Sequence, residues 1–286
     1  MEFNVPDECA GMALRDYLRY TLSLSAGLVK RAKYRDGGIC IDGREVHTNY
    51  ILVGGEVLTL TTESDGEFSS GVEAVEGTLD TVYEDEEILI INKAGGMPVH
   101  PSQNHHTDSV ANVVAYKYKN MIFRPVNRLD KGTSGLMVIA KNADICARLC
   151  SQFHTTFKKE YLGVCDGVFD EKSGVINAPI GRADGSVIKR EVRPDGKCAR
   201  TFYSVENETL LHSLVRFKIT TGRTHQIRVH ASHIGHPITN DFLYGNEDTS
   251  LISRPALHAC RIEFDYRGKA VSFDAPLPDD MKGLIL

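Results

Sequence analysis

The chain has 286 residues, of which 42% are hydrophobic and 25% are charged. This composition excludes disorder over the whole chain, and the length predicts about two domains. No stretch of about 18 apolar residues is present, so the sequence predicts no membrane span. The first residues lack a basic segment followed by an apolar one, and we therefore expect no secretory signal.

The cysteines and the charge distribution bear on the compartment and on the partner. The seven cysteines are scattered and odd in number, which favours free thiols and a cytoplasmic protein. The formal net charge is −5, but residues 45–92 hold twelve acidic residues and no Lys or Arg. The rest of the chain has 33 basic residues against 26 acidic ones, so the composition permits an RNA partner.

Residues 1–62 are predicted to form a small module. Leu14, Tyr17 and Leu18 share one face of a helix, and Asp42-Gly43 is typical of a tight turn. The expected elements are helices over 12–20 and 25–34 and strands over 39–41, around Val46 and over 56–60.

This order of two helices and a hairpin resembles the small RNA-binding domain named after ribosomal protein S-four. The resemblance implies that Lys30, Arg31 and Lys33 on the second helix bind RNA. A solvated, charged helix face with no ligand is the alternative. Polar and small residues over 63–77 predict a linker, and residues 78–286 are expected to form the second domain.

The second domain mixes strands and helices without a regular βαβ repeat, which predicts an α+β fold. Ile145, Leu149 and Phe153 recur at helical spacing, and Thr224 is a candidate helix cap. The expected elements are strands over 81–83, 88–91, 136–140, 161–165, 210–220, 262–264 and 271–273, and helices over 142–157 and 224–234.

Several common sites are absent from the sequence. It contains no G-x-G-x-x-G, no Walker loop and no G-x-S-x-G motif. His225, His230, His233 and His236 cluster along the chain, but no Cys or carboxylate accompanies them at metal-ligand spacing. We therefore predict no metal site.

Three stretches carry residues suited to catalysis. Asp130 lies in the glycine-bearing stretch NRLDKGTSGL, which leads into a buried strand. Arg228 lies beside the apolar stripe of the predicted helix 224–234, and a partly buried Arg needs an acidic partner, for which Asp130 is a candidate. Tyr161 is expected on a strand with one internal face. Taken alone, Asp130 is better explained as a turn residue whose carboxylate accepts hydrogen bonds from backbone donors.

Together with other motifs, these stretches resemble the RluA-type pseudouridine synthases, in order along the chain. The matching segments are NKAGGMPVHP from Asn92, RLD with TSGL and AK from Arg128, KEY from Lys159, GRTHQIRVH from Gly222 with GHPI, Asp241 and YG, and LHA from Leu257. The resemblance covers residues 78–286. It implies a pseudouridine-synthase-like domain with a mixed, mostly antiparallel central sheet flanked by helices.

The resemblance also implies a reaction and roles for single residues. The reaction is the isomerisation of uridine to pseudouridine in structured RNA, with no cofactor. Asp130 would be the essential carboxylate, Arg228 would pair with it and Tyr161 would stack on the uracil. Leu257 would wall the base pocket. Arg128 would contact phosphate or fill the space that the everted base leaves.

Two positions depart from the family pattern, and the target stays open. Asn127 stands where His is usual before the Arg-Leu-Asp motif, and Asn240 stands where Gly is usual. Large-subunit ribosomal RNA is the expected target, and transfer RNA is the alternative. A non-catalytic RNA-binding protein is one rival interpretation. A glycoside hydrolase is the other, but such enzymes usually need two carboxylates and Asp130 has no evident partner in the sequence. We expect a monomer.

Overall fold

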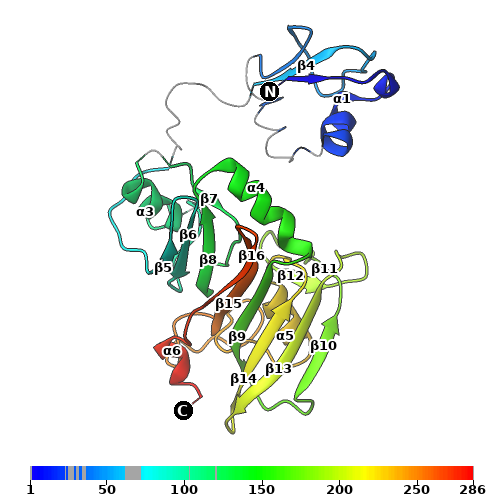
Figure 1. Ribbon diagram of the computed structural model, residues 1–286. Coiled ribbons are helices and arrows are strands. Elements are labelled where there is room, and N and C mark those ends of the chain that lie inside the picture. Colours follow the sequence, from blue (N-terminus) through cyan, green and yellow to red (C-terminus); the bar gives the residue numbers. More distant parts are fainter. Residues whose placement is uncertain are drawn as a thin grey trace. The chain divides into compact units, whose positions relative to one another are not determined.

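The computed structural model describes residues 2–22, 24, 29, 32–33, 37–61, 72–102, 104–119 and 121–285. The chain divides into two compact units, Met1–Phe68 and Ser69–Leu286. Figure 1 shows both units with their strands and helices.

The first unit contains a four-stranded antiparallel sheet in the order β1-β4-β2-β3. Its strands are β1 (Glu2–Asn4), β2 (Ile39–Ile41), β3 (Arg44–Glu45) and β4 (Val57–Leu60). A short helix, α1 (Leu14–Asp16), continues into a π-helical turn, Tyr17–Thr21, and Leu14 and Leu18 are fully buried against the sheet. The predicted strands are present, and β1 is an additional one. Most of the predicted helix over 25–34 lies outside the described residues.

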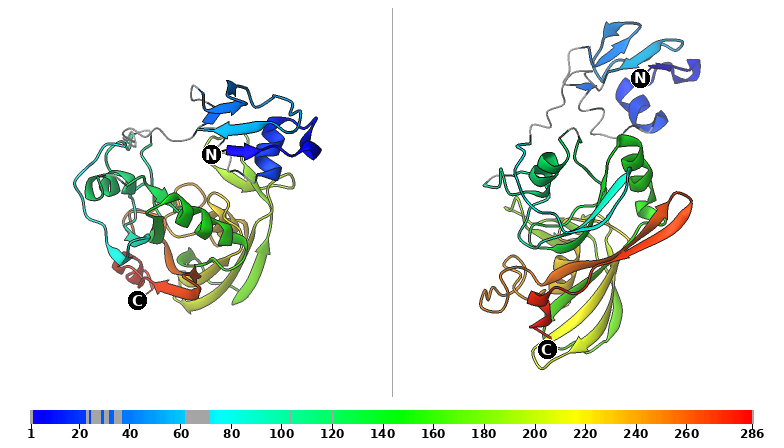
Figure 2. Two further views of the ribbon diagram at one scale, coloured as in Figure 1. Left: turned by 45° about the horizontal axis from the view of Figure 1, so that its top comes forward. Right: turned by 60° about the vertical axis from the view of Figure 1, so that its left-hand side comes forward.

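The second unit is built on a large mixed sheet. Its main path runs β10-β13-β14-β9-β15-β8-β6-β5, with β16 paired to β15 and β7 paired to β8. The strands are β5 (Thr81–Glu84), β6 (Ile88–Lys93), β7 (Arg124–Pro125), β8 (Ser134–Ala140), β9 (Lys158–Asp166), β10 (Ser173–Asn177), β13 (Arg200–Glu208), β14 (His212–Ile219), β15 (Leu257–Tyr266) and β16 (Lys269–Asp274). Only β15 and β8 pair in parallel among these described strands, so the sheet is mostly antiparallel, as expected. Figure 2 shows the long hairpin of β15 and β16.

Both faces of the sheet centre are covered. In β6, Ile88 and Ile90 belong to one buried cluster, whereas Leu89 and Ile91 belong to the other. Successive side chains of a strand point to opposite faces, so an uninterrupted apolar run requires cover on both. α4 (Ala143–Ser151) covers the first face, and α3 (Val110–Lys117), α5 (Gln226–His233) and α6 (Asp279–Lys282) supply residues to the second.

The two helices predicted in the second unit are present but shorter at their ends. α4 stops at Ser151 and is followed by a 3-10 turn, Gln152–His154, so the predicted helix to residue 157 was too long. α5 begins after His225, which occupies the N-cap position that we assigned to Thr224. A small hairpin of β11 (Ile180–Arg182) and β12 (Arg190–Val192) was not predicted, nor were β7, β10, β13 and α3.

Candidate active site

Asp130 lies in the loop between β7 and β8, at the edge of a pocket of about 660 Å³. Its side chain is 31% exposed. Asn127 fixes the start of this loop, because its buried amide donates to the Leu136 carbonyl at 3.1 Å and accepts from the Val138 N–H at 2.8 Å. The loop is therefore bonded to the middle of β8 through the Asn127 side chain.

The backbone of β8 approaches β15 closely just after this loop. Gly135 has a φ of +114°, and a Cβ at this position would lie 2.3 Å from the Ala259 carbonyl oxygen. Only glycine fits both conditions. The parallel register of Ser134 with His258 follows from this approach and brings Leu257 to the same pocket as Asp130.

Lys93 links two loops beside Asp130. Its ammonium group, with a side chain that is nearly fully buried, donates to the carbonyls of Ala94 at 2.8 Å, Met97 at 2.9 Å and Lys131 at 3.1 Å. Burial, together with the charge of Arg254, lowers the pKa of Lys93 to about 7. One side chain thus ties the loop after β6 to the residue that follows Asp130.

Arg228 projects from α5 towards Asp130, but its principal partner is another residue. Its Nη1 lies 3.5 Å from Asp130 Oδ2, whereas its Nε and Nη2 bind the two oxygens of Asp241 at 2.6 and 2.7 Å. The side chains of Arg228 and Asp241 are 4% and 0% exposed. Burial alone would lower the pKa of Arg228, but the hydrogen bonds and charge of Asp241 raise it. The expected proximity of Arg228 and Asp130 is present, and the bidentate partner Asp241 was missed.

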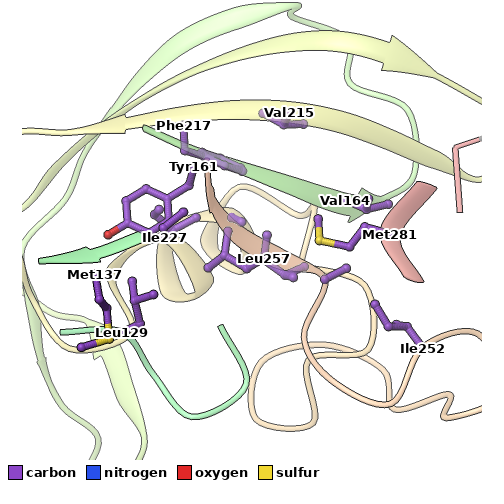
Figure 3. Packing of buried hydrophobic residues seen from close by; sticks show 14 of the residues in the cluster. Leu129, Met137, Tyr161, Val164, Val215, Phe217, Ile227, Ile252, Leu257 and Met281 are labelled. Carbon is purple, nitrogen blue, oxygen red and sulfur yellow. The ribbon is translucent and has the colours of Figure 1, made fainter. Parts of the chain in front are cut away.

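The described pocket brings together every catalytic candidate from the sequence. Tyr161 on β9 is buried between Phe217 and the apolar residues of α5, and burial followed by the Asp130 charge raises the pKa of its hydroxyl. Figure 3 shows the packed cluster that includes Tyr161, Ile227 and Leu257. The remaining candidate, Arg128, is exposed at the pocket edge.

Three other pocket residues were not proposed as site residues from the sequence. Burial and the nearby Arg128 charge lower the pKa of His100, and burial lowers the pKa of Lys159. His225 also lines the pocket, with its Nε2 3.9 Å from Asp130 Oδ2. All three residues lie in segments that resemble family motifs, and this position in the motifs is the sequence feature that could have identified them.

A second groove of about 860 Å³ adjoins the pocket and shares residues 222–224 with it. It is lined by the basic side chains Arg182, Arg190, Arg193, Lys197 and Arg223, mostly from the β11–β12 hairpin and its flanks. Arg193 is paired with Asp184 and Asp195, so the other cations dominate the charge of the groove. A polyanion fits such a surface.

The histidine cluster is not a metal centre in the described part of the chain. His230 binds Thr201 Oγ1 and the Ala178 carbonyl, and His236 binds the Asp166 carbonyl. Among the described residues, no group of three or more His, Cys, Asp or Glu side chains is arranged to hold a metal ion. The helices in the described ranges are also too short or too polar to span a bilayer.

The remaining sequence candidates lie in the first unit. Lys30 and Arg31 fall outside the described residues. Lys33 is described and exposed.

The chain is similar to known proteins over most of its length. Residues 87–233 match the family model for RNA pseudouridylate synthases. The chain is 34% identical to the ribosomal large subunit pseudouridine synthase D of Pseudomonas aeruginosa, with 98% of this chain and 93% of that protein covered. It is 36% identical to the uncharacterized RNA pseudouridine synthase YjbO of Bacillus subtilis, covering 96% and 98%.

A solved human structure, RNA Pseudouridylate Synthase Domain Containing 1, matches with a TM-score of 0.59 and 25% identity, over 70% of this chain and 83% of that one. The fold and these matches define an RNA-modifying isomerase. The chain belongs to the RNA pseudouridylate synthase family.

Proposed function

We propose that this enzyme isomerises specific uridines in large-subunit ribosomal RNA, with Asp130 as the essential carboxylate. The observation that carries the proposal is the convergence of Asp130, Tyr161, Arg228 and Leu257 on one pocket. Relatives named ribosomal large subunit pseudouridine synthase D, which cover most of the chain, support the choice of RNA. The pocket volume lies within the range of roughly 300–1,000 Å³ that small ligands occupy.

The reaction breaks the bond from uracil N1 to ribose C1′ and forms a bond from uracil C5 to the same carbon. N1 gains a proton and C5 loses one, so the atoms balance within the nucleotide. In the proposed mechanism, Asp130 either attacks C1′ or removes a ribose proton. Both routes use this carboxylate, and the Arg228 guanidinium lies 3.5 Å from its Oδ2.

Tyr161 and Leu257 would hold the uracil after it leaves the RNA stack. Both side chains are more than nine-tenths buried and line the pocket, so an entering base replaces water with apolar contact. Because the pKa of the Tyr161 hydroxyl is raised, it stays protonated and is able to donate a hydrogen bond to the rotating base. Base eversion costs a few kcal/mol, which stacking and phosphate contacts offset.

The basic groove beside the pocket would bind the RNA strand that flanks the everted uridine. Arg182, Arg190, Lys197 and Arg223 supply cations there, and Arg128 lies at the pocket edge. We further propose that residues 1–62 form an S-four-type RNA-binding module in which Lys30, Arg31 and Lys33 bind phosphates.

We propose that the enzyme is cytoplasmic, because its seven cysteines are free thiols and the cytoplasm is reducing. We also propose that the enzyme is a monomer. A transfer RNA target remains the alternative outcome.

A glycosidase interpretation fits the pocket less well. Such enzymes use two carboxylates, one of them on each side of the scissile bond. The nearby carboxylate Asp241 is fully buried and bound by both oxygens to Arg228, so it is not free to serve as the second acid.

The decisive experiment compares Asp130→Asn with the wild-type enzyme. We expect normal folding and RNA affinity but no tritium release from RNA labelled at uracil C5. Asp144→Asn is the matched control, since Asp144 is an exposed carboxylate in the first turn of α4, outside the pocket. Normal release by Asp130→Asn would refute the role of Asp130. Mapping of pseudouridines in cells that lack the enzyme shows whether the lost modification lies in ribosomal or in transfer RNA. If these cells keep every pseudouridine of the wild type, the result would support the non-catalytic interpretation.

A further inference from the structure

His225 has an unusual backbone for a helix start. Its φ is +58° and its ψ is +21°, in the left-handed region that few non-glycine residues adopt. N-cap positions favour side chains that accept a hydrogen bond from the helix, yet the His225 side chain makes no such bond. Helix capping therefore does not explain this residue, and strained backbone of this kind is often found at functional sites.

The two ring nitrogens of His225 face different groups. Nδ1 lies 2.8 Å from the Tyr244 hydroxyl, and Nε2 lies 3.9 Å from Asp130 Oδ2. The Tyr244 hydroxyl oxygen accepts the Arg190 N–H at 2.9 Å. Among the described residues, His225 Nδ1 lies at hydrogen-bond distance for the phenolic proton, and we assign Nδ1 as its acceptor. In the neutral ring the remaining proton lies on Nε2, the nitrogen that faces Asp130.

The charges around the ring come from several elements. Asp130 and Asp241 are acidic, and Arg228 and Arg190 are basic. Burial lowers the pKa of His225 and outweighs the opposing effect of Asp130, so the ring is neutral near pH 7. Burial raises the pKa of Tyr244, which keeps its proton.

We propose that His225 is a positioning residue for Asp130, held by Tyr244 as the tautomer that carries its proton on Nε2. This proposal rests on the proposed function, because it assigns a role through Asp130. Arg228 at 3.5 Å and His225 at 3.9 Å flank the same oxygen, and both separations exceed a normal hydrogen bond. The carboxylate is thus oriented from two sides while its lone pairs stay available for ribose.

A pair of substitutions separates this role from a structural one. His225→Asn keeps a side chain suited to the left-handed backbone and an acceptor near the Nδ1 position, but it has no atom near Nε2. We expect wild-type melting and KM, with kcat lowered about 10- to 100-fold. His225→Gln reaches the Nε2 position with its amide, and we expect it to recover most of the missing kcat. A His225→Asn enzyme with wild-type kcat would overturn the proposal.

A second measurement does not depend on turnover. Nitrogen-15 NMR of the ring in the full-length enzyme without RNA should show the proton on Nε2 at pH 7. In Tyr244→Phe we expect a mixture of the two tautomers, because Nδ1 no longer has its donor. A wild-type ring with its proton on Nδ1, or a doubly protonated ring, would contradict the assignment. If Asp130→Asn retains full turnover, the proposed role of Asp130 fails, whereas the NMR result still reports on His225 alone.

Discussion

The pair formed by Arg228 and Asp241 makes a sharp prediction about stability. The two side chains are bound by two hydrogen bonds of 2.6 and 2.7 Å and are 4% and 0% exposed, so solvent and salt screen them little. Replacing Arg228 by Met leaves the Asp241 carboxylate buried without its counter-charge. Asp130 is affected much less, because it is 31% exposed and only 3.5 Å from Arg228 at its nearest.

The expected cost follows from this difference in burial. Removing one partner of a buried ion pair costs about 3–5 kcal/mol, whereas exposed pairs contribute about 0–1 kcal/mol. For a unit of this size, 1 kcal/mol corresponds to roughly 2–4 °C, so we expect Arg228→Met to lower the melting temperature by about 6–20 °C. Asp130→Asn should change it by about 4 °C at most, because the ion pair of Asp130 with Arg228 is long and solvated.

Thermal denaturation of the full chain, followed by circular dichroism, measures both variants. The control is Arg228→Met combined with Asp241→Leu, in which neither charge remains. Replacing a whole buried pair by apolar residues is often close to neutral, so the double variant should regain most of the stability while staying inactive. If Arg228→Met alone melts within about 3 °C of wild type, the structural account of Asp241 is wrong.

Three further predictions concern the loop, the acid stability and RNA binding. Asn127→Leu leaves two buried backbone groups of β8 unpaired, and urea denaturation should show a loss of about 2–5 kcal/mol; a loss below about 1 kcal/mol would contradict the bonding described. Burial lowers the pKa of His258 from 6.5 to about 4. Between these two pH values the unfolded chain binds the proton and the folded chain does not. The free energy of unfolding therefore falls by about 3 kcal/mol as the pH drops through this window. His258→Gln should flatten this acid limb, and an unchanged limb would exclude His258 as its cause. RNA affinity should fall steeply with salt concentration. Neutralising Arg182 and Lys197 together should reduce the slope of log affinity against log salt concentration by about 0.7–0.9 for each phosphate that these two cations bind. An unchanged slope would exclude the groove as an RNA-binding surface.

The strands of the central sheet were largely predictable because their signals are local. The apolar run of β6 and the stretch from Leu136 to Ala140 require burial on both faces, and the residues of β8 are buried throughout. The ends of α4 and α5 were less accurate. Asn142 caps α4, close to the predicted start of that helix, but the start of α5 is set by the left-handed backbone of His225, a conformation that is uncommon for residues other than glycine.

Asn127 and Asn240 depart from the family pattern, and the structure shows how each asparagine is accommodated. Asn240 has a φ of +56°, and Asn tolerates this conformation better than most residues other than glycine. Its side chain also bonds to the Ile252 carbonyl and accepts the Asp248 N–H at 2.8 Å. The loop geometry is therefore compatible with Asn, and the side chain adds hydrogen bonds that glycine cannot make.

The sequence by itself determined which residues are candidates for the chemistry, because ordered motifs limit the choice to Asp130, Tyr161 and Arg228. It did not determine how Arg228 is held. A guanidinium near the edge of a core needs a carboxylate, but one-dimensional spacing does not distinguish Asp130 from Asp241, 13 residues beyond Arg228. The choice depends on which carboxylate the folded chain removes from water, and only the packing of α5 against the loop after it decides that Asp241 is buried while Asp130 faces the pocket.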